Sequence, residues 1–463
     1  MNESEPGRAA GSRPRVLLAL ALAAALAASL AGCAPAPQPL APPNVLFIVI
    51  DCLRSDHVGS YGYERPTTPN LDHHVAAAGT VFERAYSQAQ WTRPSLVSYL
   101  TGLYPSEHGL LEVERDAEGR ITGPALADEA VTIAEQFQAA GYATMMIGEQ
   151  FQLSKTFNLH QGFDFYRNRA GKASQIGRSA LRWFDRLEPE RPFFAYLHYL
   201  DIHWPYCPPK RFRDRFDPGE STLANCYQWA ELRSRIRSGE QQLSPADITR
   251  LEARYDEELL SVDASFGTLF PELMRRGLWD ETLVIVTSDH GEEFMEHGSI
   301  GHQGGLWDVV LSVPLIVKPP AGWPGVPTPR VSEPVELRSI VATLRQAIGA
   351  PPGAGGPSLV PYLLGETPEE APAYAISESS DEIRVRTATH SLIVGKGDGS
   401  RRLFDRSAEP LERTDLSAER PELVAGLTQV LRRWRDGLEP VTPADVEVDE
   451  ETIEGLRALG YID

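Results

Sequence analysis

The sequence has little cysteine, no excess of positive charge and only one long apolar run. Four cysteines are spread over 463 residues, and 44 Lys and Arg residues face 64 Asp and Glu residues. The formal net charge is −20 at pH 7. Nucleic-acid binding draws its affinity from Lys and Arg against phosphate, so we expect no nucleic-acid partner. An acidic soluble surface is the simplest interpretation of this charge.

The rest of the composition is that of a globular protein. Hydrophobic residues make up 42% of the chain and charged residues 23%, so disorder is not expected. A chain of 463 residues can bury a large core, and one large α/β domain with a small appendage fits better than several domains. No internal repeat is visible, and the oligomeric state is unknown from the sequence.

The one long apolar run lies in residues 1–33, which have the pattern of an export signal. Three arginines against two glutamates make this segment net +1, which leaves about −21 on the rest of the chain. The apolar run from Val16 to Leu30 leads into Leu30-Ala31-Gly32-Cys33, which resembles the bacterial lipobox. We predict a signal peptide, lipidation of Cys33, and an exported protein held to the membrane of the cell envelope by this lipid. An uncleaved membrane anchor is the alternative, although the run is short for a spanning helix.

Residues 34–43, APAPQPLAPP, predict an extended proline-rich tether. Beyond Cys33 the chain has three more cysteines, Cys52, Cys207 and Cys226. An oxidising compartment permits a Cys207 to Cys226 bridge, which the sequence leaves open. Cys52 directly follows a predicted buried strand, and we expect it to be an inert packed thiol.

Polar residues follow two buried strands at the points where these strands end. Residues 44–50, NVLFIVI, and 283–286, LVIV, are short apolar runs typical of strands buried on both faces. The first run leads to Asp51, and the second leads to Asp289 and His290. Open α/β sheets bind ligands at the carboxyl ends of their strands, so these side chains predict a cation site. A turn-capping role for Asp51 is the alternative.

Thr92 lies at the start of a helix predicted over residues 91–102, WTRPSLVSYLTG. Pro94 is tolerated in a first helical turn, which places Thr92 at or beside the N-cap. Threonine is a common cap and needs no other role there. The same backbone N–H groups and helix dipole also attract a tetrahedral anion. A neighbouring divalent cation would lower the pKa of the Thr92 hydroxyl and make it a useful nucleophile.

Residues 192–209, PFFAYLHYLDIHWPYCPP, begin as an apolar strand and end in polar residues. His198 and His203 lie there, and histidines at the end of a strand can donate a proton to a leaving oxygen. Either histidine alone is more often structural. Residues 210–243 are polar and irregular, and we expect them to shape the mouth of the substrate site.

The predicted elements alternate between helix and strand, which is typical of α/β folds. Alternation is visible through residues 131–187. A long helix is predicted from Ser244, with Pro271 kinking or dividing it. Strand-like pieces between Ile383 and Asp405 suit a small antiparallel sheet, and residues 422–436 predict a helix.

Five ordered motifs resemble the sulfatase family within the alkaline phosphatase superfamily: NVLFIVIDCLRSDHVGSYGY, WTRPSLVSYLTGLYPSEHG, HYLDIHWPY, TSDHGEEFMEHG and GHQGGLWDVVLSVPLIV. The C-terminal EGLRALGYID is similar to the ending of many bacterial members. The resemblance implies an α/β fold with a central, mostly parallel sheet flanked by helices and a smaller C-terminal antiparallel sheet. We expect residues 44–350 to form the catalytic domain and residues 351–463 a C-terminal subdomain that completes the fold.

The resemblance also implies a metal centre. By matching positions, Asp51, Asp289 and His290, together with Thr92, would hold one divalent ion, either Ca²⁺, Mn²⁺, Zn²⁺ or Mg²⁺. Cys52 stands where the calcium-binding members have a second carboxylate, which favours a different ion such as Mn²⁺ or Zn²⁺.

The same resemblance implies catalytic roles. Thr92 falls at the position of the family's nucleophile. His203, in a stretch similar to the family's His-x-Pro loop, would protonate the leaving group, and His302 falls near a Lys or His that contacts the anion. We expect His198 and Arg93 to contact the anionic ester substrate.

The sequence departs from the family pattern at the nucleophile. Members have a cysteine or serine that is oxidised to formylglycine, followed by Pro and Arg, whereas this chain has Thr92, Pro94 and Leu96. Threonine is not a substrate for that oxidation. Formylglycine ejects sulfate by collapse of its hemiacetal, but a sulfated threonine would be an ordinary alkyl sulfate. A phosphorylated threonine can be attacked at phosphorus by water or an alcohol.

We therefore predict a metal-dependent hydrolase for phosphate, phosphonate or sulfate esters outside the cytoplasm, with Thr92 as nucleophile. Three alternatives remain open. They are sulfate-ester hydrolysis by an unmodified threonine or another activated group, an envelope phosphoryl-group transferase, and a non-catalytic lipid-anchored binding protein on a degenerate hydrolase scaffold.

Overall fold

The computed structural model describes residues 1, 40–112, 114–115, 121–217 and 229–458. Contacts divide the chain into two units, Met1–Leu40 and Ala41–Asp463, and the fold is that of the second unit. Cys33 and Cys226 lie outside the described residues, so lipidation and the Cys207 to Cys226 bridge stay predictions. Within the described part of the chain, no helix combines the length and the apolar character that a membrane crossing requires.

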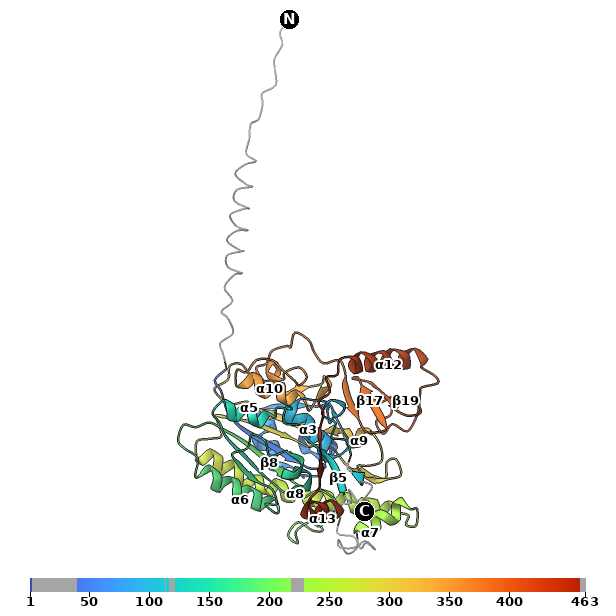
Figure 1. Cartoon of the computed structure of the whole chain (residues 1–463), viewed down its shortest axis with the longest axis horizontal. Coiled ribbons are helices and arrows are strands. Elements are labelled where there is room, and N and C mark those ends of the chain that lie inside the picture. The colour runs from blue at the N-terminus through green and yellow to red at the C-terminus, as the bar shows by residue number, and fades with distance from the viewer. Residues whose placement is uncertain (2–39, 113, 116–120, 218–228, 459–463) are drawn as a thin grey trace. The chain divides into compact units, whose positions relative to one another are not determined.

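The second unit is organised around an eight-stranded sheet (Figure 1). The strand order is β14 (Arg330–Val331), β2 (Thr80–Phe82), β13 (Leu315–Lys318), β9 (Thr282–Thr287), β1 (Asn44–Ile50), β8 (Phe193–Tyr199), β6 (Ala143–Gly148) and β7 (Phe165–Arg167). β1 runs parallel to both β8 and β9, and β6 runs parallel to β8 and β7. β13 is antiparallel to β9 and β2. The predicted mostly parallel sheet is confirmed.

Helices cover both faces of this sheet (Figure 1). On one face, Leu46 and Ile48 of β1 share a core with α6 (Ala173–Phe184) and α8 (Pro245–Arg275). On the other face, the ring of Phe47 lies 5.5 Å from that of Tyr99 in α3 (Thr92–Thr101). Because successive side chains of a strand point to opposite faces, every residue of the apolar run 44–50 has a packing partner on one side or the other.

The structure corrects two expectations about helices. Helix α8 is continuous from Pro245 to Arg275, so Pro271 does not divide it, and a kink there stays a prediction. Pro271 lies in the last turns, where its missing N–H removes one backbone hydrogen bond while the buried stripe still holds the helix. Residues 210–243 are not wholly irregular, because α7 (Trp229–Arg237) lies within them.

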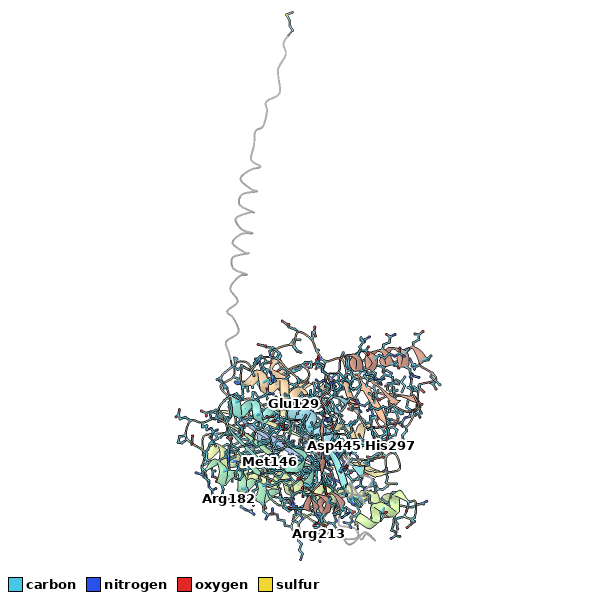
Figure 2. All side chains as sticks on the ribbon, in the orientation of Figure 1. Glu129, Met146, Arg182, Arg213, His297 and Asp445 are labelled. Atoms are coloured by element: carbon cyan, nitrogen blue, oxygen red, sulfur yellow. The ribbon has the colours of Figure 1, made fainter. Side chains whose placement is uncertain are left out.

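Many side chains are buried or exposed as their polarity predicts. Met146 of β6 is buried in the core, whereas Arg182 and Arg213 are exposed (Figure 2).

The C-terminal part forms a four-stranded antiparallel sheet, as predicted. Its strands are β16 (Ala375–Glu378), β17 (Glu382–Arg386), β18 (His390–Gly395) and β19 (Arg401–Asp405). Helix α12 (Pro421–Asp436) packs Leu427, Leu431 and Trp434 against it. After α12, β20 (Ala444–Glu447) pairs with β5 (Ile121–Ala125), and α13 (Glu450–Ala458) follows.

Candidate active site

The polar residues after β1 and β9 meet at one edge of the sheet. Because these strands are adjacent and parallel, their carboxyl ends lie side by side. Asp51 follows β1 directly, and Asp289 comes two residues after β9. The backbone N–H of Cys52 donates to Asp289 Oδ1 at 3.2 Å, which ties the two tips together. Both aspartates are completely buried.

Asp51 is held by three side chains. His198 Nε2 lies 3.1 Å from Asp51 Oδ2, and the amide of Gln150 donates to the same oxygen. The thiol of Cys52 donates to Asp51 Oδ1 at 3.1 Å. Burial alone would raise the pKa of Asp51, but the hydrogen bond from His198 and the nearby imidazoles hold it well below its usual range. Asp51 is therefore ionised.

Asp289 has a different environment. Its Oδ1 accepts from the backbone N–H groups of Cys52 and His290. Its Oδ2 makes no hydrogen bond with any residue that the structure describes, although His290 Nε2 lies 3.5 Å away. Burial and the negative charge of Asp51 raise its pKa. A buried carboxylate oxygen without a donor is costly unless a cation meets it.

The hydroxyl of Thr92 contacts His290, which in turn lies beside both aspartates. It is the first residue of α3, after the N-cap residue Trp91, as its sequence context predicts. Thr92 Oγ1 lies 3.2 Å from His290 Nε2. His290 Nδ1 donates to the carbonyl of Gly291 at 2.9 Å, so in the neutral ring Nε2 carries the lone pair. Burial opposes a charge on His290, but Asp289 and Asp51 raise its pKa.

These residues fit one divalent cation. Ligand atoms of Asp51, His198 and Asp289 all lie within 4.8 Å of one another, and so do those of Asp51, Cys52 and His290. His290 Nε2 is 4.0 Å from Asp51 Oδ1. Carboxylate oxygens, an imidazole nitrogen and the unsatisfied Asp289 Oδ2 form the donor set that hard and borderline divalent ions prefer.

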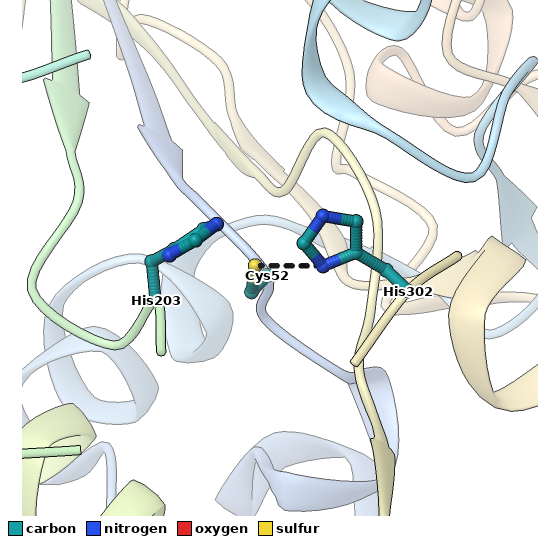
Figure 3. Close-up of side chains that lie close together, drawn as sticks. All are labelled: Cys52, His203 and His302. Atoms are coloured by element: carbon teal, nitrogen blue, oxygen red, sulfur yellow. Dashed lines mark hydrogen bonds between the residues drawn. The ribbon is translucent and has the colours of Figure 1, made fainter. Parts of the chain in front are cut away.

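A second group of side chains adjoins the first. Cys52, His203 and His302 face one another from three separate segments, with the thiol between the two rings (Figure 3). The rings of His302 and His290 lie 4.3 Å apart between centroids. Burial and the neighbouring His290 lower the pKa of His302 well below its usual range. Cys52 is completely buried, as expected for a packed thiol, and burial together with the charge of Asp51 raises its pKa, while its sulfur also contacts Asp51 and His302.

His198 and Arg93, the expected substrate contacts, both bind protein groups. His198 places Nε2 against Asp51 and Nδ1 at 2.7 Å from the hydroxyl of Tyr196. This geometry fits a residue that positions Asp51. The Arg93 guanidinium donates twice to the Gln152 side chain, and its carbon lies 3.6 Å from the centre of the Phe157 ring.

Three functional candidates were missed in the sequence. Gln150 contacts Asp51 but lies in a segment without a motif. Glu292 lies 3.3 Å from His302 Nδ1, and burial raises its pKa. It is within the TSDHGEEF stretch, where a buried acid could have been suspected.

Arg233 is the third of these candidates, and it belongs to α7, a helix that was not predicted. Its side chain is 5% exposed, and its Nε and Nη2 have no hydrogen-bond partner among the described residues. Burial raises the pKa of Glu292, while the charges of His203 and Arg233 oppose this. A side chain at Gly301, next to His302, would lie 2.8 Å from Arg233 Nη2. The guanidinium therefore approaches the loop that carries His302.

A separate cavity lies elsewhere on the molecule. A cavity of about 850 Å³ is lined by Asn44, Phe193 and Trp323, among others. Asn44 and Phe193 begin β1 and β8, so this cavity lies at the amino edge of the sheet, away from the clustered aspartates. It is not the site described above.

The sheet, its covering helices and the acid-rich carboxyl edge are those of an alkaline-phosphatase-like ester hydrolase. The chain belongs to the sulfatase family, because the family model described as Sulfatase matches residues 43–350. Enzymes of this family use a divalent metal ion. Membership in a family of ester hydrolases argues against the non-catalytic alternative.

Individual relatives support this assignment. An arylsulfatase of Clostridium perfringens (strain 13 / Type A) is 25% identical over 475 residues, covering 86% of this chain and 95% of that protein. A phosphonate monoester hydrolase of Agrobacterium radiobacter has a similar structure, with a TM-score of 0.69, 20% identity, and coverage of 85% and 95%. BT4656, solved with its substrate D-glucosamine-2-N,6-O-disulfate, gives a TM-score of 0.67, 20% identity, and coverage of 86% and 98%.

Proposed function

We propose that this protein is a metal-dependent hydrolase of phosphate, phosphonate or sulfate esters in which Thr92 is the nucleophile. The observation that carries the proposal is the position of the Thr92 hydroxyl, 3.2 Å from His290 Nε2 at the start of α3. Relatives named arylsulfatase and phosphonate monoester hydrolase support the two ester classes. The unmodified threonine favours phosphorus over sulfur, because a phosphothreonine can be attacked at phosphorus by water.

Asp51, Asp289 and His290, with the hydroxyl of Thr92, would hold the cation. Bound there, a divalent ion would stabilise charge on the ester oxygens and lower the pKa of the Thr92 hydroxyl. The Asp289 Oδ2, which lacks a hydrogen-bond partner in the described part of the chain, supports this assignment. His198 and Gln150 orient Asp51 through its Oδ2.

Cationic and N–H groups would bind the anionic part of the substrate. The backbone N–H groups in the first turn of α3 attract a tetrahedral anion at the point where Thr92 attacks. The family's arginine after the nucleophile is Leu96 here, so another cation is needed. His302 and the buried Arg233 are the candidates, and the unpaired Nε and Nη2 of Arg233, counted over the described residues, support this role.

His203 would protonate the leaving oxygen. Its Nδ1 donates to the carbonyl of Trp204 at 2.8 Å, which leaves Nε2 as the nitrogen that gives up the catalytic proton. The export signal and the lipobox-like Cys33 motivate a further part of the proposal, that the enzyme acts outside the cytoplasm while anchored to the cell envelope by a lipid.

The nucleophile can be tested with three nitrophenyl esters: phosphate, methylphosphonate and sulfate. Thr92→Ala should lower kcat/KM by at least about 10³-fold on whichever ester the enzyme hydrolyses, and Thr92→Ser should restore part of it. Thr101→Ala is the matched control. Thr101 belongs to the same helix, is equally buried, and donates its hydroxyl to the carbonyl of Val97. Full activity in Thr92→Ala would rule out this nucleophile.

A further inference from the structure

The residues Cys52, His203 and His302 form a second group of possible ligand atoms beside the two aspartates (Figure 3). Cys52 follows Asp51 after β1, His203 lies in the loop after β8, and His302 follows β11 (Ile300–Gly301). All three are buried, with exposed fractions of 0%, 3% and 1%. Segments separated by 250 residues in sequence therefore converge on one buried point.

The three ligand atoms lie close enough for one transition-metal ion to draw them together. The ligand atoms of the three residues all lie within 4.8 Å of one another, and Cys52 Sγ is 3.9 Å from His302 Nδ1. In a tetrahedral zinc site, a Zn–S bond of about 2.3 Å and a Zn–N bond of about 2.0 Å place sulfur and nitrogen about 3.6 Å apart. Closing the group around an ion thus requires shifts of a few tenths of an ångström between these two atoms.

Each of the two histidine rings has a polar group of the protein beside one of its nitrogens. His203 Nδ1 donates to the carbonyl of Trp204 at 2.8 Å, so in the neutral ring the lone pair is on Nε2. The carboxylate of Glu292 lies 3.3 Å from His302 Nδ1 and brings negative charge beside the group. A carbonyl partner of this kind fixes the tautomer and orientation of the His203 ring, whereas Glu292 contacts the same His302 nitrogen that faces Cys52 and adds only negative charge there.

The backbone conformation of Cys52 also bears on the role of its thiol. Its φ is 61°, in the left-handed region that favours glycine. A side chain in this conformation costs about 1 kcal/mol or more relative to glycine, so an inert packing position would be better filled by glycine or asparagine. The thiol at this point contacts Asp51 Oδ1 at 3.1 Å and the His302 ring. Both contacts are polar.

We infer that Cys52, His203 and His302 bind a second, thiophilic divalent cation, with Zn²⁺ as the best fit, next to the carboxylate site. One thiolate and two imidazoles favour zinc over Ca²⁺ or Mg²⁺, which prefer oxygen ligands. Binding replaces the thiol proton, which passes to solvent. Three protein ligands leave the fourth position open, as in catalytic rather than structural zinc sites.

The second cation changes one step of the proposed function. A histidine that ligates the ion through Nε2 cannot also give a proton to the leaving oxygen from Nε2. A cation held by Cys52, His203 and His302 would supply positive charge beside the leaving oxygen in place of that proton. The two roles of His203 exclude each other, and this catalytic consequence rests on the proposed function. The metal binding itself does not.

A competing arrangement uses the same thiol. Cys52 also forms a group with Asp51 and His290, so it could instead complete the first site in place of the family's second carboxylate. In the inferred second site, the thiolate stays bound to a metal when Asp289 is replaced. In the competing arrangement, replacing Asp289 removes the metal to which the thiolate is bound. The sulfur-to-cobalt charge-transfer band of Co²⁺-loaded protein reports on thiolate ligation without any turnover.

The experiment measures metal content and the cobalt spectrum of the full chain. The wild type, loaded with Zn²⁺ or Co²⁺, should hold two equivalents and show the charge-transfer band. Cys52→Ser should lose the band and one equivalent, and His302→Gln should lose one equivalent and shift the band. Asp289→Asn should lose the other equivalent and keep the band. Cys207→Ser and the exposed His73→Gln are matched controls that should behave as wild type.

Two results would overturn the inference. One is a single equivalent in the wild type at saturating Zn²⁺. The other is loss of the band in Asp289→Asn with its circular dichroism unchanged, which would assign Cys52 to the first site. Failure of the proposed function has a different signature. An active Thr92→Ala protein with two bound equivalents of metal would rule out Thr92 as the nucleophile and leave the second metal site supported.

Discussion

Two buried clusters of charged residues in this protein have opposite characters. The C-terminal ion cluster consists of Asp308, Arg384, Arg386, Arg406 and Glu412. Glu412 pairs with Arg384 through both carboxylate oxygens, and Asp308 pairs with Arg386 and Arg406. The carboxyl-edge site, made of Asp51, Cys52, Thr92, Asp289 and His290, contains no arginine or lysine.

The pKa shifts follow the same division. Burial would raise the pKa of Glu412, but Arg384 lowers it to about 2. Burial and the charge of Asp51 raise the pKa of Asp289. The C-terminal ion cluster supplies its own counter-charges, and so it stabilises the fold as built. The carboxyl-edge site sets two carboxylates against imidazoles alone, a charge balance that suits an added cation.

The sharpest test of this contrast is Asp289→Asn. The asparagine keeps an oxygen for the N–H groups of Cys52 and His290 but removes the charge and one cation ligand. Activity should fall by at least about 10³-fold, while the metal-free protein should melt at the same temperature as wild type or higher. Kinetics and thermal melts after chelation check this. A metal-free variant that melts well below wild type would show that the carboxylate stabilises the fold by itself.

Glu412→Gln should give the opposite result. Arg384 would be left buried without its counter-charge, so the free energy of unfolding should fall by about 3 kcal/mol. The kcat and metal content of the folded protein should not change. Urea unfolding measures the first quantity, and Glu419→Gln, at an exposed position, is a control expected within about 0.5 kcal/mol of wild type. A loss of metal in Glu412→Gln would mean that the two clusters are coupled.

His108 provides a third, smaller test, because burial keeps it neutral. Its Nδ1 accepts from the N–H of Leu110, and its Nε2 lies 3.2 Å from the carbonyl of Pro94 in α3. Burial lowers its pKa from 6.5 to about 3. A depressed histidine pKa stabilises the fold above the unfolded value of 6.5, and this stability is lost as pH falls below it.

The loss from His108 should be about 1 kcal/mol between pH 7 and pH 5.5. His108→Gln should remove this part of the pH dependence of the unfolding free energy, and His73→Gln should leave it in place. An unchanged acid dependence in His108→Gln would mean that the ring is charged in the folded protein, so that the hydrogen bond from Leu110 does not set its protonation.

Much of the large sheet could be predicted from local patterns. Runs such as 45–50 and 283–286 are short and apolar throughout, which is typical of strands buried on both faces. The sequence shows directly that a carboxylate follows each of these runs. Predicting that the two carboxylates lie close together needed only the assumption that the two strands are adjacent and parallel. The antiparallel direction of β13 was not predictable, because a short apolar run is the same in either direction.

The candidate site was predictable only in part. Asp51, Asp289, His290 and Thr92 come from strand ends and a helix start, which the sequence marks. Arg233 had no signal, because it belongs to a short helix in a segment rich in polar residues. Gln150 was missed since an amide between two strands resembles any other loop residue until its partner is known.

The sequence alone determined the strands, the acids at their tips and the threonine at a helix start, because these depend on neighbours a few residues apart. Tertiary structure decided the rest. Whether the thiol of Cys52 meets His302 depends on the path of every loop between them, and so does the placement of Arg233 beside Gly301. Contacts across such separations are fixed by packing, which no local pattern records.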